Sequence, residues 1–385
     1  MTGSAPALAC RQLRLRDFRN FTDVEFDVPA TGVAIIGENG SGKTNLLEAI
    51  YYLEIFRSLR GSPDEQLIRF GADVFHLRGR FEALPGEPEL EVTAAYDSKS
   101  RIKRVTVDGT QPDRLGDAVG RVRAVVFSPS DLAIVAGPPA ERRRFLDIVL
   151  SVNVPGHLAA LQHYRHALRQ RNAILRAGGS NEVLEAWDAP LVNAGARILA
   201  ERAQWVATWA TEFERRACRV GGGAGPRIAY RPGVPLTDAT REGARSTFHT
   251  ELERVRMRER ERGTTLVGPH RDDIAILTDS PDGEVDLRNF GSAGQMRTAA
   301  IALRMVEAET ARCGKGAPIL LLDDVFAELD AGRTRRILEL LEDEGHGQVV
   351  LTVPKETDLL AGAGGGADFV AALPRWRIAA GRVET

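Results

Sequence analysis

The stretch that decides the fold is VAIIGENGSGKTNLLEAI, residues 33–50. Its first four residues are apolar and end at Gly37, a pattern that predicts a short buried strand. After Thr44, apolar residues recur at three- and four-residue spacing, which predicts a helix with one face on a core. These residues are Leu46, Ala49, Ile50 and Leu53. The predicted order is therefore strand, glycine-rich loop, helix.

In this setting the loop fits the phosphate-binding P-loop pattern. Glycines permit positive φ and a close approach of the backbone to a ligand. We expect Lys43 to meet the β and γ phosphates of a nucleotide and the Thr44 hydroxyl to meet Mg²⁺. The alternative is a glycine-rich turn that contains a lysine by chance. The loop consists of Gly37, Glu38, Asn39, Gly40, Ser41, Gly42, Lys43 and Thr44.

Composition limits the remaining possibilities. The 385 residues are 43% hydrophobic, enough for one large domain or two ordinary ones. The formal net charge of -2 provides no global positive field, so any nucleic-acid surface must be local. The three cysteines, Cys10, Cys218 and Cys313, are far apart, which argues against a disulfide framework or a zinc site. Without a membrane-length apolar run or a signal-like start, the chain is expected to be soluble and cytoplasmic.

The order of elements predicts an α/β fold. Alternating patterns predict strands at 22–28 and 90–96, the latter in an antiparallel hairpin with 102–107. From Val154 to residue 262 helical patterns dominate, and Pro190 is expected to kink a helix or begin one. Strands are then predicted at 264–269 and 272–277, followed by alternating strands and helices. The expected domains are 1–150 (ATPase head, N-terminal part), 151–262 (helical arm) and 263–385 (ATPase head, C-terminal part).

The second motif is acidic and reads PILLLDDVFAELD, residues 318–330. Four apolar residues precede Asp323 and Asp324, the arrangement known as Walker B. In such a motif the first carboxylate holds Mg²⁺ through water, and the second orients or deprotonates the attacking water. The alternative is a buried strand that ends in a solvated turn.

A third motif lies in NFGSAGQMRTAAIALRMVEAE, residues 289–309. Small residues from Gly291 to Gly294 precede a helix with one apolar face, and a helix N-terminus of this kind binds anions. A single nucleotide in one subunit does not require two such helix starts. We therefore expect this one to serve a nucleotide held by a second copy in a head-to-head dimer. The alternative is a simple serine-capped helix.

Along the chain the P-loop comes first, the signature segment second and the acidic motif third, with a helical insertion between the first two. In this order the three motifs resemble the ABC-type ATPase heads of SMC-like proteins. Other stretches resemble RecF, a family of bacterial DNA-repair ATPases, over essentially the whole chain. They are LRLRDFRNF, VVFSPSDLAIVAGPPAERRRFLD, HALRQRNAIL and TLVGPHRDDI. The resemblance implies a mixed-sheet ATPase head split by a helical arm, dimerisation on ATP, and binding to DNA gaps and junctions. It further implies action with RecR and RecO to load the RecA recombinase.

Carried over residue by residue, the resemblance also implies a site. Lys43 and Thr44 end the Walker A loop, Asp323 holds the metal, and Asp324 takes the water-activating position that is usually glutamate. The signature that reaches the partner's γ-phosphate consists of Ser292, Gly294 and Gln295, and Asp330 lies in the D-loop that crosses the dimer. Two departures leave the water-activating residue open: residues 129–131 lack the glutamine of a Q-loop, and Thr352 stands where a switch histidine is expected.

Contact with DNA follows mainly from the resemblance. For each candidate cluster of basic residues, an ordinary solvated face is the favoured alternative. Arg57 and Arg60 could touch phosphates or DNA, or equally be solvated surface. The GPHRDD segment, residues 268–273, is predicted to be a turn between strands and not a metal site. The candidate clusters are Arg101, Lys103 and Arg104 on the hairpin, and Arg142, Arg143 and Arg144 beside the insertion.

The sequence therefore predicts a weak ATPase that uses ATP and Mg²⁺. Its ATP-bound homodimer would clamp DNA, and hydrolysis would release it. Two alternatives remain: an ATPase that serves as a scaffold for protein partners, and an ATPase coupled to membrane subunits.

Overall fold

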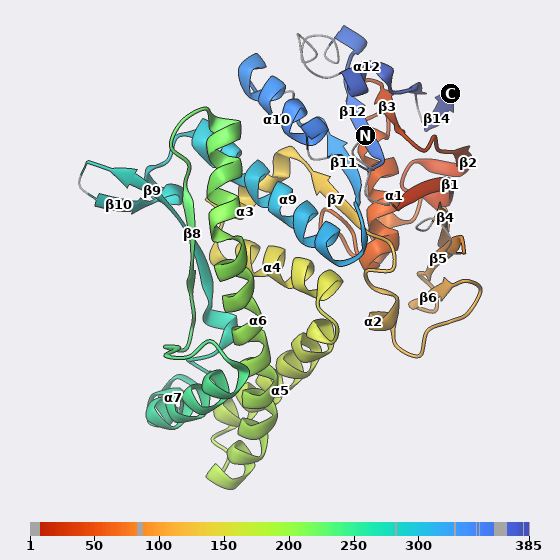
Figure 1. Ribbon diagram of the computed structural model, residues 1–385. Helices are drawn as coiled ribbons and strands as arrows, with labels where there is room; N and C mark the ends of the chain where they lie inside the picture. Colours follow the sequence, from red (N-terminus) through yellow and green to blue (C-terminus); the bar gives the residue numbers. More distant parts are fainter. Residues whose placement is uncertain are drawn as a thin grey trace. The chain divides into compact units, whose positions relative to one another are not determined.

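The computed structural model describes residues 8–82, 88–281, 283–326, 329–343, 345, 347–357, 368–379 and 381–384. The chain divides into two compact units, which are described separately (Figure 1). The first contains the described residues of Met1–Asp131, Arg219–Gly222 and Leu303–Thr385, and the second contains Leu132–Cys218 and Gly223–Ala302. The boundaries of these two units differ from those of the predicted segments 1–150, 151–262 and 263–385. The three-part division stays a prediction.

The first unit contains a six-stranded sheet in the order β14-β13-β3-β12-β11-β7. Its neighbouring strands are parallel except for the antiparallel pair β13–β14, so the sheet is mixed, as predicted. The central strands are continuous apolar runs because both faces are covered. The strand bounds are β3 (Gly32–Ile36), β7 (Ala124–Phe127), β11 (Ile319–Asp323), β12 (Val349–Val353), β13 (Arg375–Ala379) and β14 (Arg382–Glu384).

A second sheet of the first unit is antiparallel, in the order β2-β1-β4-β5-β6. Its residues alternate between a buried and a more exposed face, the period expected of half-buried strands. The predicted hairpin of 90–96 with 102–107 is confirmed by the pairing of β5 with β6. The strand bounds are β1 (Ala9–Phe18), β2 (Phe21–Asp27), β4 (Val74–Glu82), β5 (Leu90–Asp97) and β6 (Ile102–Val107).

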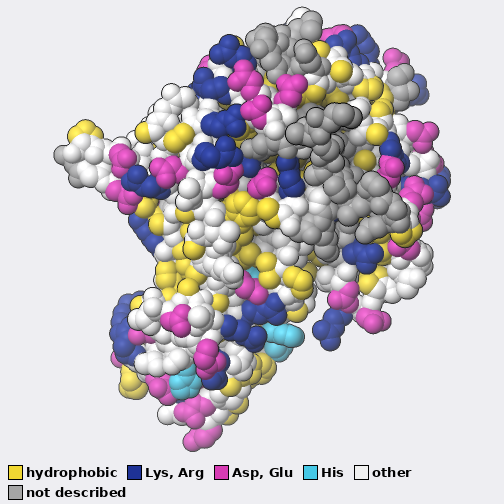
Figure 2. All heavy atoms as spheres, viewed as in Figure 1, with side chains coloured by type: hydrophobic (Ala, Val, Ile, Leu, Met, Phe, Trp, Pro, Cys, Tyr) yellow, Lys and Arg dark blue, Asp and Glu magenta, His cyan; other side chains and the backbone are white. Residues whose placement is uncertain are grey.

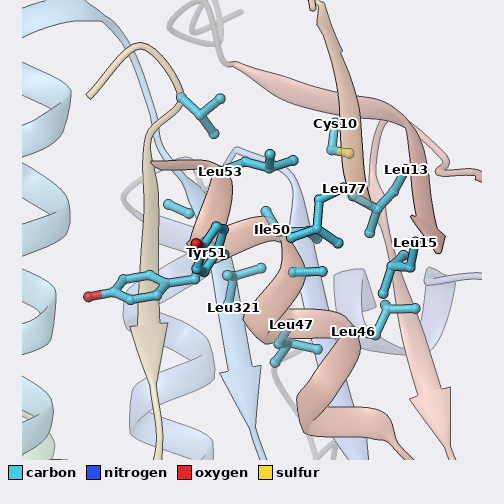
Figure 3. Close-up of a cluster of buried hydrophobic side chains, with 14 of the residues drawn as sticks. Cys10, Leu13, Leu15, Leu46, Leu47, Ile50, Tyr51, Leu53, Leu77 and Leu321 are labelled. Carbon is cyan, nitrogen blue, oxygen red and sulfur yellow. The ribbon is translucent and has the colours of Figure 1, made fainter. Parts of the chain in front are cut away.

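Helix α1 (Lys43–Ile55) lies between these two sheets and holds the glycine-rich loop at its N-terminus. Figure 3 shows its apolar side chains packing toward Leu13, Leu15 and Leu77 of the antiparallel sheet, and Leu321 of the other sheet lies near the same helix. Burial on both sides explains why the helix is apolar around most of its circumference. The other helices of this unit are η1 (Asp64–Leu67), α2 (Leu115–Ala118), η2 (Pro129–Asp131), α10 (Ala331–Asp343) and α12 (Asp368–Ala372).

The second unit is built on helices whose apolar faces form one core. Leu161 and Tyr164 of α5, Leu191 and Ile198 of α6, and Phe248 of α7 belong to it. The predicted small helical bundle is therefore confirmed. The helices are α3 (Leu132–Ala136), α4 (Pro139–Asn153), α5 (His157–Ala177), α6 (Asn181–Gly221), α7 (Arg241–Arg262), η3 (Pro269–Arg271) and α8 (Leu287–Phe290), with α9 (Ala293–Lys315) running on into the first unit.

Three local predictions in this part of the chain were wrong or incomplete. Strand β8 (Arg227–Arg231) was not predicted, yet it pairs with β9 (Asp273–Ser280), which also pairs with β10 (Gly283–Asp286). Residues 264–269 form no strand, because Thr265 is held instead by the side chain of Asn172. Pro190 lies inside α6, so it begins no helix, and the other predicted role, a kink, stays a prediction.

On the face shown in Figure 2, basic and acidic side chains lie interspersed. This mixture is expected of a chain whose formal net charge is -2. Among the described residues, no helix is long and apolar enough to cross a membrane.

Candidate nucleotide-binding site

The glycine-rich loop joins the end of β3 to the start of α1, as predicted. Gly40 and Gly42 have φ of 83° and 115°, values that L side chains rarely adopt. A Cβ atom on Gly42 would lie 2.4 Å from the Asn20 Nδ2, and one on Gly37 would lie 2.5 Å from the Ile378 carbonyl oxygen. Glycine is therefore required by conformation at Gly40 and Gly42, and by space at Gly37 and Gly42.

The side chain of Lys43 folds back over this loop. Its side chain is only 4% exposed, and its Nζ donates to the carbonyl oxygens of Gly37 at 2.7 Å and Glu38 at 3.3 Å. The same nitrogen lies 3.8 Å from a carboxylate oxygen of Asp324. A lysine in a chance surface turn would keep its ammonium in water, so the geometry favours the phosphate-binding interpretation.

The acidic motif meets the P-loop at the end of β11. The Thr44 hydroxyl donates to Asp323 Oδ1 at 2.8 Å, although the two residues are 279 positions apart. Asp323 is only 7% exposed, which does not fit the alternative of a solvated turn. The two residues predicted to hold the metal are therefore in direct contact.

Thr352 completes this arrangement. Strands β11 and β12 are parallel, and their register places Thr352 beside Asp323. The Thr352 hydroxyl donates to Asp323 Oδ1 at 3.0 Å and accepts from the Asp324 N–H at 3.0 Å. Asp324 has φ of 48°, in the left-handed region that non-glycine residues seldom adopt. Thr352 thus holds both acidic residues where a switch histidine was expected.

The residues present fit a magnesium ion bound together with a nucleotide. Mg²⁺ prefers oxygen ligands and in such sites takes one or two protein oxygens, with phosphate and water oxygens supplying the rest. The Thr44 hydroxyl and the Asp323 carboxylate are oxygens of this kind, and they already touch. In the described part of the chain, no group of three or more His, Cys, Asp or Glu side chains could hold a metal by itself.

Asn20 is a site residue that sequence reasoning missed. It lies in the turn between β1 and β2, where its Nδ2 donates to the Ser41 carbonyl at 3.0 Å and its Oδ1 accepts from Asn45 at 2.8 Å. It therefore fastens the P-loop to the first turn of α1. The only signal was its place in the RecF-like stretch LRLRDFRNF, since the contact itself depends on tertiary structure.

The segment where a Q-loop would lie forms η2. Asp131 accepts from the Ser128 N–H at 2.8 Å and pairs with Arg304 at 2.6 Å. Arg304 also pairs with Glu307, one turn further along α9, at 2.7 Å. Asp131 is therefore part of a buried network of ion pairs with Arg304 and Glu307.

The signature residues begin α9, and Ser292 and Gly294 belong to the second unit. The Gln295 N–H donates to Ser292 Oγ at 3.2 Å, and the Ser292 N–H donates to Gln295 Oε1 at 2.8 Å. This reciprocal pair is a capping box, so the serine-capped helix is confirmed as a local role. A cap does not exclude anion binding, because further N–H groups of the first turn have no acceptor within the helix. Contact with a partner's phosphate stays a prediction.

Asp330 caps the next helix, α10, with its side chain. Its Oδ1 accepts from the Arg333 N–H at 2.9 Å, and its Oδ2 lies 2.9 Å from the Arg333 guanidinium. The backbone hydrogen bond, helped by that guanidinium, lowers the pKa of Asp330. Its predicted role in the D-loop across a dimer is untested.

The candidate DNA-contacting residues fall into two groups. Arg142 is buried, and its guanidinium bonds Asp273 at 2.7 and 3.0 Å, so the prediction that it contacts DNA is wrong. Arg143 donates to the Asp272 carbonyl at 2.7 Å, and Lys103 pairs with Asp64 at 2.7 Å. The residues that remain exposed are Arg57, Arg60, Arg101, Arg104 and Arg144.

The GPHRDD segment contains the short helix η3 and leads into β9; because residues 264–269 form no strand, the prediction of a turn between two strands is wrong. The Tyr164 hydroxyl lies 2.6 Å from His270 Nδ1, and Thr265 O lies 3.1 Å from His270 Nε2, so the ring donates to Thr265 and accepts from Tyr164. Burial lowers the pKa of His270 to about 4. Asp272 is buried and bonds Arg202 at 2.6 Å. These side chains are fully engaged in holding the second unit together.

Comparison with known proteins agrees with these features. The family model described as RecF/RecN/SMC N terminal domain matches residues 9–363. The DNA replication and repair protein RecF of Salinibacter ruber is 38% identical over 352 residues, covering 89% of this chain and 84% of that protein. RecF of Roseiflexus castenholzii is 35% identical and covers 96% and 98%.

Solved structures show the same relationship. The recombination mediator protein RecF-ATP in the RecFOR pathway superposes with a TM-score of 0.85 at 26% identity, covering 100% of this chain and 99% of the other. The Smc head domain of Pyrococcus furiosus has a TM-score of 0.56 at 14% identity and shares the fold alone. The family resemblance and the fold class inferred from the motifs are confirmed.

Proposed function

The chain belongs to the RecF family of DNA replication and repair proteins, and from this premise we propose that it is an ATP-dependent DNA-binding protein of recombinational repair. The observation that carries the proposal is the meeting of Lys43, Thr44, Asp323 and Asp324 at one end of the six-stranded sheet. The proposed setting is the cytoplasm. The proposed partners are DNA, a second copy of the chain, and mediators of the RecR and RecO type.

In the proposed reaction each residue has a separate task. The Lys43 ammonium neutralises charge on the β and γ phosphates of ATP, whose negative charge also suits the first turn of α1. Thr44 and Asp323 hold Mg²⁺, which when bound supplies further charge neutralisation. Asp324 accepts a proton from water as the water oxygen attacks the γ phosphorus and the bond to ADP breaks. Thr352 holds Asp324 in place for this step.

The proposal includes a cycle between two states. The ATP-bound dimer has composite sites in which Ser292 and Gly294 of one copy contact the γ-phosphate held by the other. ATP favours the closed state through these differential contacts, and the closed dimer clamps DNA. Slow hydrolysis removes the γ-phosphate that joins the copies and releases the DNA.

Sedimentation velocity with Mg-ATP tests the dimer. Ser292→Arg is expected to abolish an ATP-dependent dimer because it places a bulky cation at the composite site. Ser292→Ala separates loss of the helix cap from steric block, and Ser246→Arg is a matched control at an exposed position of α7. A wild-type protein that stays monomeric with ATP, or a Ser292→Arg protein that dimerises normally, contradicts the proposal.

A DNA-binding measurement distinguishes the proposed function from the alternative of a scaffold for protein partners. Fluorescence anisotropy with gapped DNA, with and without ATP, is expected to show ATP-dependent binding. A protein that hydrolyses ATP but binds no DNA under either condition would instead fit a scaffold for protein partners.

A further inference from the structure

Phe290 is an exposed aromatic residue of the second unit. It is 72% accessible to solvent and lies two positions before Ser292, the first residue of the signature. The Cα atoms of residues two positions apart lie at most about 7 Å from each other. The ring is therefore close to whatever Ser292 contacts, and it gains free energy when that partner covers it.

Helix α8 fixes the position of this ring. Leu287, at the start of the helix, is fully buried, and Asp286 caps the helix by accepting from the Arg288 N–H at 3.0 Å. At the other end the Gly291 N–H donates to the Leu287 carbonyl at 2.8 Å. A Cβ atom on Gly291 would lie 2.5 Å from that same oxygen, so a side chain there would disrupt this turn. A partner that covers Phe290 therefore does not have to order the segment first.

In the first unit, the β13–β14 hairpin flanks the nucleotide-binding loop. The Gly381 N–H, in the turn of the hairpin, donates to the Ser41 carbonyl of the P-loop at 3.3 Å. A Cβ atom on Gly381 would lie 2.6 Å from the Asn20 carbonyl oxygen, so the turn also lies against the residue that fastens the P-loop. A group that reaches phosphates on this loop therefore comes close to the hairpin.

Arg382 lies directly after this turn and is exposed. Trp376 and Ile378 of β13 are buried, so Ala379 belongs to the outward face of the hairpin. The strand register pairs Ala379 with Arg382, which places Arg382 on the same face. Among the residues that the structure describes, Arg382 forms no ion pair.

The acidic residues of this region lie beside another arginine of β13. Glu356 pairs with Arg377 at 2.9 Å, and the strand register places Glu384 across from Arg377. Arg382 is therefore the cation of this face that remains for a partner, at the end of the hairpin nearest the P-loop.

We propose that, in the ATP-bound dimer, Phe290 of one copy packs against the β13–β14 hairpin of the second copy, with its ring over the Arg382 guanidinium. An arginine is attracted to the negative face of an aromatic ring, and Arg382 and Phe290 are both exposed. This contact rests on the proposed function, in which Ser292 reaches the phosphates held by the second copy. It names a further pair of residues that joins the two copies, and two-fold symmetry makes it twice in each dimer.

Cysteine crosslinking tests the contact directly. The full chain, with the exposed Cys313 replaced by serine, carries Phe290→Cys and Arg382→Cys together. With Mg-ATP and a short bis-maleimide we expect a covalent dimer on a denaturing gel, and with Mg-ADP far less. The single-cysteine variants exclude symmetric crosslinks. Met257→Cys with Arg382→Cys is the matched control, since Met257 is also 72% exposed.

Sedimentation velocity with Mg-ATP measures the strength of the contact. Phe290→Ala is expected to raise the Kd of the dimer by about 10- to 100-fold, because each dimer loses the contact twice. Arg382→Ala should have a similar effect, and the double variant should dimerise more tightly than the product of the two effects predicts. Phe290→Tyr and Arg382→Lys keep the ring and the cation, so both should dimerise nearly as the wild type does.

Three results overturn the contact. They are a wild-type Kd in Phe290→Ala, independent effects of the two alanine variants, and no ATP-dependent covalent dimer at concentrations where sedimentation shows the dimer. An increased Kd in Phe290→Ala but not in Arg382→Ala also overturns it, because the ring then contacts another part of the second copy or its nucleotide. A wild type that stays monomeric with ATP removes the proposed function itself, whereas an ATP-dependent dimer unaffected by Phe290→Ala removes this contact alone.

Discussion

Replacement of Thr352 by valine probes how the acidic residues are held. Valine has nearly the same shape but lacks the hydroxyl that donates to Asp323 and accepts from the Asp324 N–H. Thr352 is fully buried, so water does not replace these bonds. A hydrogen bond to a charged group contributes about 1.5–3 kcal/mol, and a buried N–H without a partner costs about 1–3 kcal/mol. Together we expect the free energy of unfolding to fall by about 3 kcal/mol.

The same substitution should reduce catalysis more than nucleotide binding. Asp324 holds a strained backbone conformation, and the N–H bond to Thr352 is one of the contacts that keep it there. Loosening a reacting group by about 1 Å can cost on the order of 100-fold in rate. We therefore expect kcat for ATP hydrolysis to fall by about 10- to 100-fold, with little change in KM because Lys43 and the loop are untouched.

Steady-state ATPase assays and urea unfolding measure the two effects. Thr352→Ser is the matched control: it keeps the hydroxyl and loses one buried methyl group, at a cost of about 1 kcal/mol. Its kcat should stay near that of the wild type. Equal kcat in the serine and valine variants, or wild-type turnover in Thr352→Val, would refute the reasoning.

Three further predictions follow from single groups. Asp324→Asn should bind ATP, lose turnover and accumulate the dimer in sedimentation velocity; turnover at the wild-type rate would contradict its role. Burial raises the pKa of Glu54 well above its ordinary value, so its contribution to stability is lost as pH rises. Glu54→Gln should therefore raise Tm at pH 8 but not at pH 4, because an amide oxygen still accepts the Ala124 N–H; equal Tm at pH 8 would argue against it. Burial lowers the pKa of His270 from 6.5 to about 4, so below pH 6.5 the unfolded chain binds the proton more readily. Stability should fall by about 3 kcal/mol as pH drops from 6.5 to 4, and a His270→Gln variant with an equally steep profile would show that another group is responsible.

Local patterns sufficed for much of the fold. The run from Val33 to Ile36, the apolar spacing of α1 and the alternation in β2, β5 and β6 each depend on neighbouring residues, and all were predicted correctly. The glycines of the P-loop were recognisable for the same reason, because φ is a property of a single residue. Strand β8 was missed because its short pattern is stabilised by pairing with β9, more than 40 residues away in the chain.

The sequence by itself determined the class of protein, the P-loop, the acidic motif and the signature, since each is a contiguous string whose chemistry depends on residue type and spacing. Only the tertiary structure decided which of the candidates meet. The parallel pairing of β11 with β12 puts Thr352 against Asp323 and Asp324, the β1–β2 turn puts Asn20 on the P-loop, and packing in the second unit buries Arg142 against Asp273. The reason is physical: hydrogen bonds and burial depend on distances in space, and strand register and helix packing set those distances between residues as far apart as Thr44 and Asp323.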